Sequence, residues 1–173
     1  MIKPNFHRLW LEFPDHTKYP SLKHLYTAFG GVAEKNIYVA GFGPDGNAFA
    51  SRMSAAFNKA GAPINAALAA TAGARTLSTA DGSQIIYGVA DLRKYLFKAL
   101  GKPTIDRTSP YDDAFRGRKG IIAFSVNWRS ATGHIALWNG RNYREPGRDN
   151  YSTYVSSADP TIRTSLGEFW ELA

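Results

Sequence analysis

Two neighbouring apolar runs in the last third of the chain most constrain its fold. Residues 120–128 (GIIAFSVNW) and 133–139 (GHIALWN) are rich in aliphatic and aromatic residues, and only a short polar connection separates them. Such a spacing predicts two antiparallel strands. The second run alternates, which places His134, Ala136 and Trp138 on one face. We therefore expect a half-buried strand with a histidine near its beginning.

The residues before this strand pair show mainly helical patterns. Helices are predicted after the capping residues Asn5 and Ser21 and over 48–61 and 91–101, and further strands over 83–89 and 166–172. The alanine-rich stretch 64–83 is expected to be a long irregular excursion. Helices followed by an antiparallel sheet define an α+β fold. Because no linker or repeat interrupts the pattern, residues 1–173 are predicted to form a single domain.

Composition narrows the possible partners and location. The chain of 173 residues is 44% hydrophobic, which is enough to bury a core. It has no run of eighteen apolar residues, so we expect no membrane insertion. Its start (MIKPNFHRLW) lacks the apolar stretch of a signal peptide, so we expect that, if the protein works outside the cytoplasm, it does not leave by a cleavable signal. The net charge of +7 favours anionic partners. No nucleic-acid-reading motif accompanies this charge, so no specific nucleic-acid binding is expected.

The chain contains no cysteine. Disulfides, thiolate metal sites and thiol nucleophiles are therefore excluded together. Its histidines (His7, His16, His24 and His134) show no HxxxH or HxH spacing. We accordingly expect no metal site and no cofactor.

A glycine-rich stretch (38–47) leads into the 48–61 helix, and a histidine strand follows far downstream. Cysteine amidases use this arrangement, because a helix N-terminus favours a thiolate and a sheet can present the base. Several segments carry a more specific resemblance: KPNFHRLWLEF, NAFASRMSAAFNKAGAPI, IYGVADLRKYLFKALGKP, GRKGIIAFSV, GHIALWNG and SLGEFWEL. On these segments the chain resembles family 4 of the type VI secretion amidase effectors. These are small bacterial toxins of papain-like (NlpC-type) fold that cleave peptidoglycan peptide crosslinks.

The resemblance implies roles for individual residues. His134 falls on the family's general base, and Glu145 stands where an acidic residue that orients this base is expected, with Asp149 as the fallback. A carboxylate beside His134 would raise its pKa. Asn47 and Trp138 are expected to contact the substrate. The fold implied is an α+β amidase fold with N-terminal helices packed on an antiparallel sheet.

The nucleophile position departs from the family pattern. Where family members carry cysteine, this chain has Phe49, whose ring cannot attack a carbonyl. Ser51 and Ser54 are the nearby hydroxyls. A helix rotates by roughly 100° per residue, so Ser51 should point away from the Phe49 direction, and Ser54 lies more than a turn deeper.

Three functions remain open from the sequence. The first is a cell-wall effector in which the ancestral amidase activity is lost or replaced. The second is a hydrolase with a nucleophile other than cysteine, and the third is a binding protein in which Phe49 and Trp138 make the groove apolar. The resemblance further implies peptidoglycan, a cognate immunity protein and the type VI secretion apparatus as partners, with delivery to the periplasm of a target bacterium.

Overall fold

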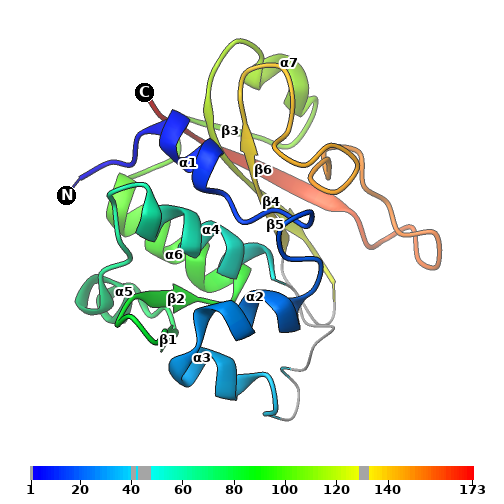
Figure 1. The fold of residues 1–173 in the computed structure, drawn as a ribbon. Coiled ribbons are helices and arrows are strands. Elements are labelled where there is room, and N and C mark those ends of the chain that lie inside the picture. The colour runs from blue at the N-terminus through cyan, green and yellow to red at the C-terminus, as the bar shows by residue number, and fades with distance from the viewer. Residues whose placement is uncertain (1, 40–41, 43–47, 129–132) are drawn as a thin grey trace.

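The computed structural model describes residues 2–39, 42, 48–128 and 133–173. Within these ranges the helices are α1 (Phe6–Glu12), α2 (Leu22–Phe29), α3 (Gly31–Asn36), α4 (Phe49–Lys59), α5 (Ala66–Ala72), α6 (Val89–Leu100) and α7 (Tyr111–Phe115). The strands are β1 (Thr76–Ser78), β2 (Gln84–Ile86), β3 (Ile105–Arg107), β4 (Gly120–Val126), β5 (Gly133–Trp138) and β6 (Thr164–Glu171). Helices dominate the first half and the main sheet forms from the second half, as the α+β expectation requires (Figure 1).

The main sheet has four antiparallel strands in the order β3-β6-β4-β5. The predicted pairing of the two apolar runs is confirmed, with Phe124 of β4 opposite His134 of β5. The C-terminal strand β6 lies on the other side of β4, so that β4 is central. Figure 1 shows α4 and α6 between this sheet and the small β1–β2 hairpin.

Both faces of β5 are covered, which corrects the expectation of a half-buried strand. All six residues of β5 are buried. On one face Ile135 and Leu137 join the core formed with the helices α1, α4 and α6. On the other face Ala136 and Trp138 pack in a second core with residues of α7. An alternating sequence therefore does not mean exposure here, because α7 and the segment after β5 cover the second face.

The predicted helix starts at Asn5 and Ser21 are confirmed. The Asn5 side chain accepts a hydrogen bond from the Arg8 N–H, and that of Ser21 accepts one from the His24 N–H. The predicted helix over 48–61 corresponds to α4, which packs against α1 on one side and against β2 and β5 on others. This helix brings its first residue, Phe49, to the beginning of β5.

The expectation of an irregular excursion over 64–83 is wrong. Asn65 caps α5 by accepting from the Leu68 N–H, and alanine has the highest helix propensity. The strand expected over 83–89 ends at Ile86, and α6 already begins at Val89. Four short elements (α3, β1, β3 and α7) were not predicted, because segments of three to six residues carry little periodicity.

Close packing of β4 on β6 yields a stability prediction. A Cβ on Gly120 would lie 2.0 Å from the Trp170 carbonyl oxygen of the neighbouring strand. Gly120→Ala should therefore force the strands apart and lower the free energy of unfolding by about 1–3 kcal/mol. Urea unfolding measures this change. Gly88→Ala is the matched control, since its new Cβ would meet nothing closer than 3.5 Å, and equal midpoints for the two variants would contradict the prediction.

Candidate functional site

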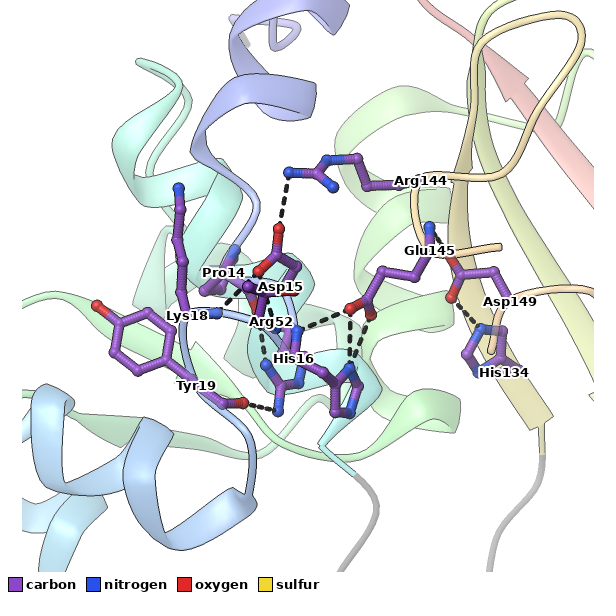
Figure 2. A network of polar contacts seen from close by, with 11 residues as sticks. Pro14, Asp15, His16, Lys18, Tyr19, Arg52, His134, Arg144, Glu145 and Asp149 are labelled. Carbon is purple, nitrogen blue, oxygen red and sulfur yellow. Dashed lines mark hydrogen bonds and ion pairs between the residues drawn. The ribbon is translucent and has the colours of Figure 1, made fainter. Parts of the chain in front are cut away.

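His134 is paired with Asp149 inside the protein. The His134 Nε2 lies 2.9 Å from the Asp149 Oδ1, and the two side chains are 0% and 3% exposed. The second carboxylate oxygen, Oδ2, accepts the backbone N–H of Glu145 at 2.8 Å. Both Asp149 oxygens are therefore engaged, and the carboxylate holds the imidazole in one orientation (Figure 2).

Glu145 does not make the expected contact with His134. Its carboxylate accepts the His16 backbone N–H at 2.7 Å and lies 2.9 Å from the His16 Nδ1 (Figure 2). The reason is a turn, in which the Glu145 carbonyl oxygen accepts the N–H groups of Arg148 and Asp149. This turn folds the shorter Asp149 side chain back onto His134 and sends the Glu145 side chain toward residues 14–19. The geometry thus selects the fallback carboxylate.

Burial sets the electrostatic state of His134. It lowers the pKa of this histidine below the usual value, although the hydrogen bond and charge of Asp149, and the charge of Glu145, act to raise it. This direction corrects the raised pKa expected from the sequence. A neutral ring that donates from Nε2 to Asp149 leaves a lone pair on Nδ1. Among the described residues, the buried Nδ1 has no hydrogen-bond partner.

Two aromatic rings contact the His134 imidazole. The ring of Phe49, at the start of α4, is centred 3.7 Å away and is nearly perpendicular to it, at 80°. The ring of Tyr151 stacks on it at 4.5 Å and 27°. Phe49 is itself half-buried. His134 has no exposed surface, so a substrate could reach it only after residues that cover it move.

The two nearby serines have structural partners. The Ser51 hydroxyl lies 2.5 Å from the Tyr26 Oη, and Ser54 donates to the Ile86 carbonyl while accepting the Ile86 N–H, each at 3.1 Å. Both serines are fully buried. Each hydroxyl therefore holds α4 to a neighbouring element, which gives no support to either serine as a nucleophile.

The structure describes one of the two residues that are expected to bind the substrate. Trp138 is buried, donates its indole N–H to the Phe115 carbonyl at 2.9 Å and packs against Tyr143. It belongs to the core beneath α7, and this burial gives no support to the expectation that it contacts the substrate. Asn47 lies outside the described residues.

A polar network that the sequence did not reveal fixes the segment before α2 beside the site. The buried Arg52 of α4 donates to the carbonyls of Pro14 and Tyr19, each at 2.7 Å. Arg144, next to Glu145 in the chain, pairs with Asp15 at 3.1 Å. Figure 2 shows these contacts converging between α4 and the segment that carries Asp149. Sequence reasoning had no signal for this network, because its members lie far apart in the chain.

In the ranges that the structure describes, no group of three or more histidine, cysteine, aspartate or glutamate side chains is arranged to hold a metal ion. None of the helices described is both long and apolar enough to cross a membrane. The His134–Asp149 pair lies beside the start of α4 and forms the candidate functional site.

A helix that begins beside a sheet-borne histidine, itself held by a carboxylate, defines the class of papain-like amidase folds. Comparison with protein families gives the particular group. Residues 46–166 match the family described as type VI secretion system (T6SS) amidase effector protein 4 (Tae4), and the chain belongs to this family.

Solved structures support the same relationship over the whole chain. Tae4 from Salmonella typhimurium, in complex with the immunity protein Tai4 from Enterobacter cloacae, is 30% identical with a TM-score of 0.80, covering 99% of this chain and 100% of that one. The Tae4–Tai4 complex from Enterobacter cloacae gives 28% identity, a TM-score of 0.80 and the same coverages. Tae4 from Enterobacter cloacae is 27% identical with a TM-score of 0.78, covering 99% of this chain and 98% of that one. A search of curated protein sequences found no match.

The lowered pKa of His134 predicts a pH-dependent stability. As the pH falls below about 6.5, the unfolded chain binds a proton on this histidine while the folded protein resists it. The free energy of unfolding should therefore fall with pH in that window, by up to about 1.4 kcal/mol per pH unit, until the folded pKa is reached. Urea unfolding between about pH 8 and pH 5 measures this slope. In His134→Gln, the part of this pH dependence that comes from His134 should disappear.

Variants of the two carboxylates separate their roles. Asp149→Asn removes the hydrogen bond and charge that raise the pKa of His134, so this pKa should fall further. Glu145→Gln removes only a charge that does not contact His134, and should lower the pKa by less. NMR titration of the imidazole nitrogens gives both values. A His134 pKa above 6.5 in the unmodified protein, or a larger shift in Glu145→Gln, would contradict the assignment.

Proposed function

We propose that this protein is a type VI secreted antibacterial effector that acts on peptidoglycan by binding it, without cysteine-based hydrolysis. The observation that carries the proposal is the Phe49 ring at 3.7 Å from the buried imidazole of His134. Membership of the amidase effector family supports the target, and the net charge of +7 suits a polymer that carries carboxylates.

The chemistry of the site supports binding over cleavage. A thiol amidase needs a thiolate beside its base, to form an acyl intermediate that water then hydrolyses. At the start of α4 this chain offers an aromatic ring, and the Ser51 and Ser54 hydroxyls are engaged with Tyr26 and Ile86. The His134 Nδ1 therefore faces no described group whose proton it could accept. We infer that the ancestral reaction is absent.

The family relationship also suggests a partner and a location. The similar Tae4 proteins from Salmonella typhimurium and Enterobacter cloacae were solved bound to the immunity protein Tai4. We infer that this chain has a cognate immunity protein and that the type VI apparatus delivers it to the periplasm of a target bacterium. An immunity protein remains useful to the producing cell if binding alone disturbs the cell wall.

Sedimentation with purified sacculi tests the binding function. The unmodified protein should sediment with sacculi and release no soluble muropeptides detectable by mass spectrometry. Iodoacetamide should change neither result, because the chain has no thiol. Muropeptides released by cleavage of peptide crosslinks would overturn the absence of hydrolysis. Failure to sediment at low ionic strength would overturn binding.

Restoring sulfur tests the role of the Phe49 position. Phe49→Cys places a thiol beside His134, so weak crosslink cleavage should appear and should vanish when His134→Ala is added. Loss of the ring costs at most about 3–5 kcal/mol, and less if the half-buried site relaxes. Phe57→Cys is the matched control, since it makes the same exchange in the buried part of α4, away from the histidine. Equal cleavage by the two variants, or none by folded Phe49→Cys, would contradict this account of the position.

A further inference from the structure

A cluster of half-buried aromatic rings continues outward from the candidate site. Tyr151, which stacks on His134, is 5.4 Å from the Trp128 ring and 5.2 Å from the Tyr154 ring, measured between centroids. Trp128 and Tyr154 are themselves 5.3 Å apart. We call Trp128, Tyr151 and Tyr154 the aromatic shelf. Each of the three side chains is partly exposed to solvent.

The shelf differs from the apolar cores of the protein. Trp128 and Tyr154 belong to none of the three core clusters, and Tyr151 only borders one of them. Each ring keeps part of its apolar surface exposed to water, and adjoining exposed apolar surface of this kind is typical of ligand-binding sites. Packing of the core therefore does not account for the three rings.

Hydrogen bonds hold the shelf in one arrangement before any ligand arrives. The Trp128 Nε1 donates to the Tyr154 Oη at 3.1 Å. Thr164 of β6 donates its hydroxyl to the Tyr151 carbonyl and its backbone N–H to the Tyr154 carbonyl. The Asn127 side chain bridges the Thr161 carbonyl and the Arg163 N–H. A rigid aromatic surface loses little conformational entropy on binding, which favours recognition.

We propose that the aromatic shelf binds the glycan strand of peptidoglycan by stacking on its N-acetylated sugar rings. A β-linked hexosamine presents a face of axial C–H groups, and such a face packs on aromatic rings while its hydroxyl and acetamido groups stay hydrated. The tyrosine hydroxyls at the edge of the shelf offer hydrogen bonds to those groups. The proposal rests on the peptidoglycan-binding function above and names the part of the polymer that is recognised.

Charge near the shelf favours a glycan that carries peptide stems. Arg163 is exposed, and its backbone N–H donates a hydrogen bond to the side chain of Asn127, which precedes Trp128. Arg148 is also exposed and immediately precedes the Asp149 that holds His134. Stem peptides bear carboxylates at intervals along the strand, which exposed guanidinium groups complement.

The test uses the tetramer of β-1,4-linked N-acetylglucosamine and, separately, a free stem tetrapeptide. In the unmodified protein, the sugar should shift the NMR resonance of the Trp128 indole N–H, because this group lies within the shelf. Trp128→Phe identifies the resonance. Trp128→Ala and Tyr154→Ala should each weaken sugar binding by about tenfold or more. Tyr38→Ala, which removes a tyrosine that is 79% exposed on another part of the surface, should leave the affinity unchanged.

The outcomes separate this proposal from the function on which it rests. If the stem peptide shifts the Trp128 resonance and the sugar does not, the glycan assignment is overturned. It is also overturned if neither probe shifts this resonance. If the protein sediments with sacculi and folded Trp128→Ala sediments equally well, the shelf proposal fails while peptidoglycan binding stands. If the sugar binds at the shelf and sacculi do not retain the protein, the shelf proposal stands and the peptidoglycan function fails.

Discussion

The burial of β5 on both faces is the constraint on which the candidate site depends. With α4 and α6 on one side and α7 on the other, the strand places His134 where water does not reach it. A buried imidazole is more stable when neutral, and its ring nitrogens require partners from the protein itself. Asp149 provides the partner of Nε2, and the rings of Phe49 and Tyr151 pack against the imidazole.

The position of Asp149 depends in turn on the segment that carries it. Its second oxygen accepts the Glu145 N–H, and the Glu145 side chain is bound to His16. Arg52 holds residues 14–19 from the opposite direction. Chain segments that are distant in sequence therefore fix one carboxylate through short contacts. A substitution that breaks the His16–Glu145 contact would therefore affect His134 in two ways. It would move the backbone of the turn that holds Asp149, and it would change the charge near the imidazole.

Much of the fold could be predicted from local patterns, and the failures have local causes too. Helix caps at Asn5 and Ser21 and the β4–β5 pairing follow from short-range rules, and the structure confirms them. The helix α7 has five residues, too few for a periodic signal, and its absence from the prediction made β5 appear half-exposed. Missing one short helix thus produced the error about the burial of β5.

The site shows the same limit at the level of single residues. The family resemblance pointed to His134 and to two carboxylates, but the choice between Glu145 and Asp149 depends on a turn whose hydrogen bonds the sequence does not reveal. The aromatic shelf was equally hidden, because Trp128 and Tyr154 come together only when β4 and the segment before β6 are folded. Local chemistry could be predicted, whereas the contacts between distant segments required the structure.

The retention of a histidine–carboxylate pair beside Phe49 needs no catalytic explanation. Removing either partner would leave the other buried without its hydrogen bond, at a cost of about 1–3 kcal/mol or more for a charged group. The pair would therefore contribute to stability whether or not it takes part in a reaction. Phe49 adds to this effect, because its ring packs edge-to-face against the imidazole, with the two ring centroids 3.7 Å apart. Catalytic geometry and structural stability favour the same His134–Asp149 contact, so the presence of that contact does not by itself indicate an active enzyme.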